Sequence, residues 1–438
     1  MATEFYEEIM GKLETYRTQK EFTVPATMQA VVLSGVGFEN LACREVPVPA
    51  VGDNQLLCRV DAAGVCTSII KLLAQGPKHT FINGWDLAAY PVILGDEGSV
   101  TVAKVGKNLQ KQYAPGQRFG VQPAVDVPPI NHRERYTDHA RGMNKTAVGY
   151  TLGGNLAQYI LVGEEVLAGQ CLLPLPDEAM PYFAVSMGEP ISCISSAQER
   201  QIHIHKAGPF GQRVPKLGLL EGGNAVVVGA GAMGLMHAEL ALRYKPKNLL
   251  VCDILPERLA TAQRILAPKA KQLGVNLLTI NTANPDALKE TLMKVSDGAG
   301  ADDIILAVGI QPVQQAALEL LGRGGVANLF GGLPRGKHML QIDAIAVHYN
   351  EIKVVGSSGG DPSDLASALE LIANGHIDAG NYVRGIGSLK HAPAVLGLIQ
   401  EGKMDGKAIL YPHAETDELR MVDYWDGGQE AEHMERYL

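Results

Sequence analysis

The sequence lacks several features that would assign it to other classes of protein. No apolar run approaches the roughly 20 residues that span a bilayer. The N-terminus is acidic and does not have the basic and then apolar layout of a signal peptide. The six cysteines include no CxxC pair, so we expect no disulfide framework. These absences predict a cytoplasmic protein that does not enter a membrane.

Positive charge is also scarce. Lys and Arg total 38 against 47 Asp and Glu, which gives a net charge of −9. General attraction to nucleic acid or to an anionic membrane is therefore not expected. Charged residues make up 19% and hydrophobic residues 46% of the 438 residues. This composition argues against disorder, and the length predicts two domains.

The most informative segment that is present is Gly229-Ala-Gly231-Ala232-Met233-Gly234. It follows an apolar run and opens a stretch with helical character. In that context the first glycine makes a tight turn, the second lets the backbone approach a pyrophosphate, and the third lets helix and strand pack closely. The pyrophosphate would lie at the N-terminus of the helix, at Ala232 and Met233. A glycine turn with only a structural role is the alternative.

An acidic residue stands where a dinucleotide site needs one. Asp253 ends the next apolar run, nineteen residues after Gly234 (253 − 234). Its carboxylate would accept hydrogen bonds from the adenosine ribose and repel a 2′-phosphate, which predicts NAD rather than NADP. Gly309 and Gly332 follow the C-terminal ends of later strands, where open α/β sheets bind ligands. They are predicted to face the nicotinamide half, although ordinary turn glycines fit the pattern equally well.

The residue pattern changes along the chain. Short apolar runs broken by Gly, Pro and Asp predict a twisted β-rich domain over residues 26–188. Alternating helix and strand within residues 189–350 predict a parallel sheet, and residues 351–438 return to a mixed pattern like that of the β-rich domain. Residues 1–25 are predicted to form a helical extension whose apolar side holds Phe5, Ile9, Leu13 and Tyr16.

Three further motifs carry a resemblance to a known family. They are Val-Cys66-Thr-Ser68, Gly-Asp96-Glu97-Gly and Gly-Glu189-Pro-Ile-Ser-Cys. The chain resembles the zinc-dependent medium-chain dehydrogenase/reductases from about residue 28 to 412, and looks most like their sorbose-1-phosphate reductase branch. The resemblance implies an α/β protein with a GroES-like catalytic domain, built from 26–188 and 351–438, and a Rossmann NAD-binding domain with a doubly wound parallel sheet.

The same resemblance implies one catalytic zinc ion. It places Cys66, Asp96 and Glu189 as ligands, with Glu97 able to approach the metal. Asp96 stands where the family usually has histidine. Thiolate and carboxylate both suit Zn²⁺, but three negative ligands lower its Lewis acidity. The alternative is a metal-free protein in which Cys66 is a small buried apolar residue. Residues 122–150 contain no cysteine, so the second, structural zinc site of many relatives is not expected.

Ser68 and Lys71, which follow Cys66, stand where the family has parts of a proton relay. Ser68 holds the family position whose hydroxyl bridges the substrate to the relay, since a hydroxyl donates and accepts at once; a turn or cap serine is the alternative. Lys71 stands where many relatives have a relay histidine. It would exchange protons, hold a substrate phosphate or be a surface lysine. The basic segment 122–154 is either a solvated loop or oligomer contact, or a cationic rim for an anionic substrate.

Together these features predict an NAD-dependent, zinc-assisted oxidoreductase. It would interconvert a secondary alcohol and a ketone on a polyol or sugar, with or without a phosphate. The expected partner is this small molecule, and family habit implies a homodimer or homotetramer. One alternative is a zinc-free NAD(P)H-dependent reductase. Another is a nucleotide-binding redox sensor without turnover, favoured by Asp96 and by Ile69, which replaces a family aspartate.

Overall fold

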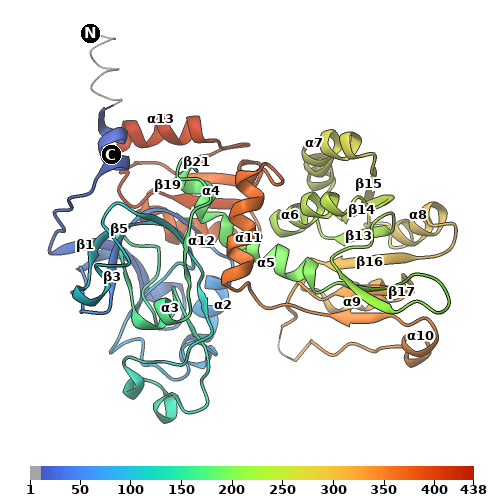
Figure 1. The fold of residues 1–438 in the computed structure, drawn as a ribbon, viewed down its shortest axis with the longest axis horizontal. Helices are drawn as coiled ribbons and strands as arrows, with labels where there is room; N and C mark the ends of the chain where they lie inside the picture. The colour runs from blue at the N-terminus through green and yellow to red at the C-terminus, as the bar shows by residue number, and fades with distance from the viewer. Residues whose placement is uncertain (1–10, 335) are drawn as a thin grey trace, which may run out of the picture. The chain divides into compact units, whose positions relative to one another are not determined.

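The structure is a computed structural model that describes residues 11–334 and 336–438 (Figure 1). The chain forms two compact units. Unit 1 joins the chain up to Ser192 with Asp361–Leu438, and unit 2 is Cys193–Gly360. Within the described residues, no helix combines the length and apolar character needed to cross a membrane.

Unit 1 is rich in short strands, as predicted. Its strands are β1 (Thr27–Leu33), β2 (Leu41–Pro47), β3 (Leu56–Gly64), β4 (Val92–Ile93), β5 (Glu97–Val105), β6 (Arg118–Val121), β7 (Ala124–Val125), β8 (Thr146–Ala147), β9 (Tyr159–Val162), β10 (Leu172–Pro174), β19 (Val383–Gly387), β20 (Lys407–Leu410) and β21 (Arg420–Met421). Its helices are α2 (Ser68–Gln75), α3 (Glu164–Ala168), α4 (Tyr182–Ser186), α11 (Pro362–Ala373), α12 (Ala392–Gln400) and α13 (Gly427–Tyr437).

The main sheet of unit 1 is built from both segments of the chain. Its strand order is β10-β6-β5-β3-β20-β19-β21, and β9 also pairs with β3. β20 pairs antiparallel with β3, with Ile409 opposite Gly64. In Figure 1 the late strands accordingly lie beside the early ones. β3 is buried along its whole length and runs through the centre of the apolar core. The C-terminal end of β3 therefore lies deep in unit 1.

The N-terminal helix is present over residues 11–18; Phe5 and Ile9, predicted for the same helix, lie outside the described residues. Leu13 is buried, and its backbone N–H donates to Glu435 of α13. The Tyr16 ring lies 3.4 Å from the Arg59 guanidinium. Arg59 is itself buried beside Asp61, with Nε donating to the carboxylate at 2.8 Å. The helix therefore packs on the body of unit 1.

The C-terminal helix α13 is joined to α4 by one buried carboxylate. Glu430 accepts hydrogen bonds from the N–H groups of Tyr182 at 2.8 Å and Phe183 at 2.7 Å, at the start of α4. The Tyr411 hydroxyl also donates to it at 2.9 Å. Burial raises the pKa of the Glu430 carboxyl, and these donors oppose the shift. Helix α13 was not predicted from the sequence, although Asp426 begins it with a capping box.

Unit 2 alternates strand and helix. After α5 (Gly188–Glu199), which begins in unit 1, its strands are β11 (Ile202–Lys206), β12 (Arg213–Leu217), β13 (Asn224–Val228), β14 (Asn248–Asp253), β15 (Asn276–Asn281), β16 (Ala301–Leu306), β17 (Leu321–Asn328) and β18 (Lys353–Val355). Its helices are α6 (Ala232–Ala241), α7 (Pro256–Leu273), α8 (Ala287–Val295), α9 (Gln311–Leu318) and α10 (Ala344–Tyr349).

A parallel sheet forms the centre of unit 2. Its strand order is β15-β14-β13-β16-β17-β18, and every neighbouring pair is parallel. Figure 1 shows β15, β14, β13, β16 and β17 following one another in this order. It is the Rossmann order, with the switch point between β13 and β16. The two units divide at 192/193 and 360/361, whereas the predicted boundaries are 188/189 and 350/351.

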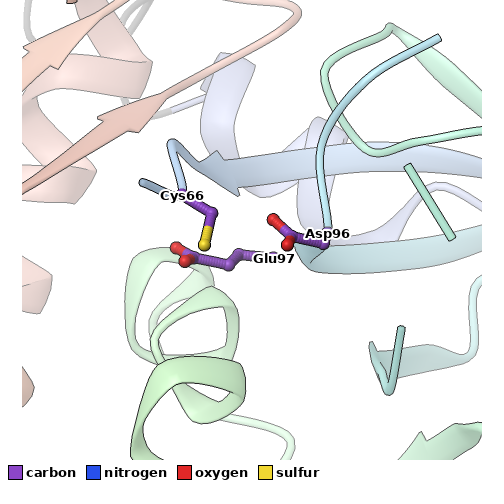
Figure 2. A group of neighbouring side chains, drawn as sticks. All are labelled: Cys66, Asp96 and Glu97. Atoms are coloured by element: carbon purple, nitrogen blue, oxygen red, sulfur yellow. The ribbon is translucent and has the colours of Figure 1, made fainter. Parts of the chain in front are cut away.

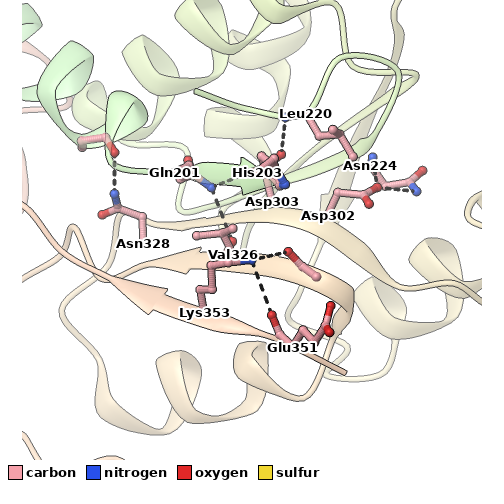
Figure 3. A network of polar contacts seen from close by, with 12 residues as sticks. Gln201, His203, Leu220, Asn224, Asp302, Asp303, Val326, Asn328, Glu351 and Lys353 are labelled. Carbon is pink, nitrogen blue, oxygen red and sulfur yellow. Dashed lines mark hydrogen bonds and ion pairs between the residues drawn. The ribbon is translucent and has the colours of Figure 1, made fainter. Parts of the chain in front are cut away.

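The hairpin of β11 and β12 was not predicted. Buried polar contacts attach it to the sheet (Figure 3). Asp303 of β16 accepts hydrogen bonds from Gln201 at 2.8 Å and from the backbone N–H of Leu220 at 2.7 Å. The His203 ring lies 2.9 Å from the same carboxylate. Burial raises the pKa of the Asp303 carboxyl, and His203 opposes the shift. The hairpin is thus tied to unit 2 at its base.

We expect Glu430→Ala to destabilise unit 1 by at least about 2 kcal/mol, because two backbone N–H groups and a phenol would lose a buried acceptor. Both tryptophans, Trp85 and Trp425, lie in unit 1, so urea unfolding followed by tryptophan fluorescence measures this unit. Glu432→Ala, at an exposed position of the same helix, is the control. Equal unfolding midpoints in both variants would contradict the role of Glu430.

Candidate active site

Cys66, Asp96 and Glu97 come together because β3 and β5 pair antiparallel. Gly64, the last residue of β3, lies opposite Glu97, the first residue of β5. Residues just past one strand end and just before the other therefore meet at the same place. Figure 2 shows the three side chains turned toward one another there. A sulfur or oxygen atom of each lies within 4.8 Å of the others.

Ser68 connects the helix that follows to this cluster. Its hydroxyl donates to Asp96 Oδ2 at 2.9 Å, and its backbone N–H points to Cys66 Sγ at 3.4 Å. Ser68 is the first residue of α2, so the helix begins beside the cluster. The Ser68 hydroxyl thus touches one of the predicted ligands.

The cluster has buried polar atoms that no protein group satisfies. Asp96 Oδ1 and Glu97 Oε2 are buried and accept no hydrogen bond of ordinary geometry from the described residues. Burial raises the pKa of the Cys66 thiol and of both carboxyls. Buried anions without partners are costly, so the cluster is short of positive charge. A thiolate and two carboxylates are a donor set that zinc accepts, and the residues therefore fit a zinc ion.

The cation nearest to the cluster was not predicted from the sequence. Lys407, the first residue of β20, is buried and its ammonium is paired with Glu97 Oε1. Burial lowers the pKa of Lys407, but the charges of Glu97 and Cys66 outweigh it and the net shift is upward. Lys407 therefore stays charged inside the unit. A lysine that precedes the apolar run Ala-Ile-Leu resembles the solvated end of a strand, so the sequence offered no local signal.

The fourth predicted ligand lies outside this group. Glu189 is the second residue of α5 and is buried. It is not among the residues whose ligand atoms lie within 4.8 Å of one another, although its charge raises the pKa of the Cys66 thiol. Its place as a ligand stays a prediction.

Lys71 and the basic segment 122–154 are less directly tied to the cluster. Lys71 is exposed on α2, so its three predicted roles all stay open. In the basic segment, Arg135 lies over the Tyr90 ring at 4.1 Å, and Lys145 pairs with Asp126 at 2.6 Å. These two cations are therefore engaged within unit 1.

Tyr150 is a second residue near the cluster whose role the sequence analysis missed. It is buried and stacks on His79 with 5.0 Å between ring centroids. Burial raises the pKa of the Tyr150 phenol, the charge of Asp96 adds to the shift, and a hydrogen bond with Ser68 opposes it. Tyr150 lies within the basic segment 122–154, and nothing local in the sequence connects it with Ser68.

The glycine fingerprint of unit 2 has the predicted strand–turn–helix setting. Gly229 follows β13 with φ of 98°, which other residues rarely adopt. Gly231 precedes α6, whose first residues are Ala232 and Met233. At Gly234 a Cβ would lie 1.8 Å from the carbonyl oxygen of Gly229, whereas at Gly231 the nearest atom is 4.0 Å away. Gly234 is therefore required by packing, and Gly231 leaves open space at the helix N-terminus.

Asp253 ends β14 and closes the same loop. Its carboxylate accepts hydrogen bonds from the backbone N–H groups of Ala230 at 2.8 Å and Leu255 at 3.0 Å. Arg258 Nη1 lies 3.5 Å from it. The side chain is only 6% exposed, so one face of the carboxylate is already used by the protein.

Gly309 and Gly332 lie against each other. A Cβ at Gly309 would be 2.5 Å from the carbonyl oxygen of Gly332, and one at Gly331 would be 2.4 Å from the carbonyl carbon of Val308. Close packing of two turns is thus a sufficient reason for these glycines. Their predicted contact with the nicotinamide half stays a prediction.

Comparison with known proteins decides the family. A family model described as an alcohol dehydrogenase GroES-like domain matches residues 52–177, and one described as a zinc-binding dehydrogenase matches residues 232–374. Protein YggP of Escherichia coli is 30% identical over 92% of this chain and 91% of its own length. The chain belongs to the zinc-type medium-chain dehydrogenase/reductase family. It is an alcohol-dehydrogenase-type oxidoreductase.

Other relatives carry more specific names. Mannitol-1-phosphate 5-dehydrogenase of Aliivibrio fischeri is 29% identical over 86% of this chain and 85% of its own. L-sorbose 1-phosphate reductase of Klebsiella pneumoniae is 29% identical over 86% of each chain. A zinc-binding dehydrogenase from Sinorhizobium meliloti, bound to NADP, superimposes with a TM-score of 0.68 at 22% identity, over 89% of this chain and 100% of that one. The predicted family and fold class are confirmed.

We expect Gly234→Ala and Gly231→Ala to differ in the stability of unit 2 when no nucleotide is bound. An added methyl group at Gly234 meets backbone, so this variant should destabilise unit 2 by about 1–3 kcal/mol. Gly231 has φ of −71°, which alanine adopts freely, so that variant should match the wild type. Hydrogen–deuterium exchange of β13 and β14 in nucleotide-free protein makes the comparison. Equal protection in the two variants would show that the turn tolerates a side chain at Gly234.

Proposed function

We propose that this protein is an NAD-dependent, zinc-assisted dehydrogenase that interconverts a secondary alcohol and a ketone on a polyol or sugar phosphate. The observation that carries the proposal is the cluster of Cys66, Asp96 and Glu97, whose ligand atoms lie within 4.8 Å of one another. The names of the sugar-phosphate relatives support the substrate class.

The three side chains would hold the metal, and the unsatisfied oxygens of Asp96 and Glu97 would be two of its donors. A bound zinc ion supplies Lewis acidity to the substrate oxygen, and the nicotinamide carries the hydride. The Ser68 hydroxyl is already a donor to Asp96. As it takes the substrate hydroxyl proton during oxidation, it would pass its own proton to Asp96 Oδ2, and both transfers would reverse during reduction. Tyr150, whose phenol interacts with Ser68 and with the charge of Asp96, would fix the direction of that hydroxyl.

The preference for NAD over NADP rests on Asp253. Its negative charge would repel a 2′-phosphate and its carboxylate would accept from the ribose hydroxyls. Arg258, 3.5 Å away, is the feature that would favour NADP, and a structural relative is bound to NADP. Asp253 ends β14 and is buried. Because its negative charge would oppose a 2′-phosphate there, we propose NAD.

Loss of the thiolate should remove both metal and activity. We expect Cys66→Ser to lower zinc affinity and turnover at least about 100-fold, because a ligand is lost. Metal content of protein purified without chelator, and oxidation of mannitol 1-phosphate or reduction of L-sorbose 1-phosphate, are the measurements. Free mannitol and sorbose test the phosphate requirement. Cys43→Ser, on β2 and away from the cluster, is the control.

Full activity of Cys66→Ser would show that the protein is not zinc-assisted. If the protein binds stoichiometric zinc but turns over none of these substrates, the proposed metal site stands and the proposed substrate class is wrong.

Cofactor choice is tested with Asp253→Asn, which keeps an oxygen to accept from Ala230 but loses the charge. We expect the ratio of kcat/KM for NADP to that for NAD to rise about tenfold or more, a change of about 1.4 kcal/mol. Arg258→Ala in the same background should reverse the rise if the guanidinium binds the 2′-phosphate. An unchanged ratio in Asp253→Asn would refute the proposed basis of NAD selection.

A further inference from the structure

One face of the β11–β12 hairpin is apolar and open to solvent. On this face Ile202 lies opposite Leu217, and the next pair along the strands is Ile204 and Pro215. Ile204 is 49% exposed and Leu217 is 61% exposed. His203 lies on the opposite face, which turns toward the parallel sheet. An exposed face of this composition is typical of a surface that another protein covers.

The outer end of the hairpin carries an exposed ring and two opposed cations. Phe210 is fully exposed at the tip. Lys206 lies directly opposite Arg213 on the apolar face, and like charges directly opposite each other destabilise a strand pair. Arg213 forms no ion pair with a described residue. Because a two-stranded hairpin is only marginally stable in water, the outer part of this one is suited to a partner that supplies apolar contact and negative charge.

The charge of the hairpin also indicates which kind of surface it fits. Ile202–Leu217 contains three cations, Lys206, Arg213 and Lys216, and no acidic residue. The hairpin therefore carries a formal charge of +3, whereas the rest of the chain carries −9 − 3 = −12. Two hairpins packed face to face would bring like charges together, which is unfavourable at an interface. The complementary surface is therefore an acidic one elsewhere on a second copy.

An acidic surface with exposed apolar side chains surrounds β21. Residues 415–426 carry a net charge of 1 − 5 = −4. Met421 is 55% exposed and Tyr424 is 38% exposed. β21 is the last strand of the main sheet of unit 1, so one of its edges is open. Lys390 pairs with Asp417 at 3.4 Å, but both side chains are exposed and such a pair contributes little.

We propose that the hairpin binds residues 415–426 of a second copy of this chain. Lys206 and Arg213 face the carboxylates of that segment, and the apolar face of the hairpin covers Met421 and Tyr424. In a two-fold pair each copy gives its hairpin and receives the other, so the contact is made twice. The 16 residues of the hairpin and the 12 of the segment place 28 residues of each copy in the contact, which matches the roughly 20–30 residues a side of a stable interface.

The test reverses the charge of the hairpin in the full-length protein and measures self-association by sedimentation velocity over a range of concentrations. We expect Lys206→Glu with Arg213→Glu to weaken association at least about tenfold, because attraction at the interface becomes repulsion. The variant keeps a like-charge pair across the hairpin, so the melting temperature should stay at the wild-type value. Lys271→Glu with Lys289→Glu is the matched control, since it makes the same charge change at exposed positions of α7 and α8.

A second pair of substitutions identifies the receiving surface. Asp417→Lys with Glu418→Lys should weaken association by itself, and combined with the reversed hairpin it should restore association in large part. Hydrogen–deuterium exchange of the wild type should show that residues 202–217 and 415–426 are protected at high protein concentration and lose protection on dilution.

Several results would overturn the proposal. They are wild-type protein that is monomeric at every concentration, association that the reversed hairpin leaves unchanged, a combined variant that is not restored, and protection that does not depend on concentration. Monomeric protein whose hairpin becomes protected only when a DNA duplex is added would assign the hairpin to nucleic acid instead. None of these results bears on zinc content or substrate turnover, which test the proposed function separately.

Discussion

Concentrated negative charge inside unit 1 is the constraint on which the rest of the catalytic region depends. Three strands converge where β3 ends, and the pairing of β3 with β5 places Cys66, Asp96 and Glu97 within 4.8 Å of one another. Such a group is stable in an apolar core only if hydrogen bonds and cations satisfy it. The protein supplies one hydroxyl, from Ser68, and one ammonium, from Lys407. Two carboxylate oxygens still lack hydrogen-bond partners among the described residues. These two oxygens make the site suitable for a divalent ion.

The nucleotide-binding unit could be predicted from the sequence because its signals are local. Strand, turn, helix and the acidic end of β14 follow one another within a short stretch, and right-handed crossovers then dictate a parallel sheet. The strands of the alternating pattern predicted within residues 189–350 are present as β13 to β17. By contrast, family resemblance alone predicted Cys66, Asp96 and Glu189 as ligands. Their spacing has no local pattern, since antiparallel pairing and not sequence proximity brings the first two together.

Contacts that depend on pairing between distant strands could not be predicted at all. From its sequence context, Lys407 resembles the solvated end of a strand. Its ammonium reaches Glu97 because β20 pairs with β3. Tyr150 likewise becomes relevant only when its loop packs beside Ser68. The β11–β12 hairpin was missed for another reason. β11 alternates isoleucine with histidine but is only five residues long, and β12, Arg-Val-Pro-Lys-Leu, is exposed along its whole length and contains a proline. Both give a weak strand signal.

The proposed cofactor selectivity of Asp253 would be part of the fold, because the same carboxylate also has a structural role. The carboxylate that would discriminate against a 2′-phosphate also holds the backbone N–H of Ala230 inside the glycine turn. Gly234 packs closely against the same turn, because a Cβ there would overlap the carbonyl group of Gly229. A replacement that removes the carboxylate altogether is therefore expected to loosen the turn that is predicted to bind the pyrophosphate. An exchange of cofactor preference has to keep an acceptor at residue 253 while removing its charge, and the adjacent Arg258 is then the residue through which a 2′-phosphate would be held.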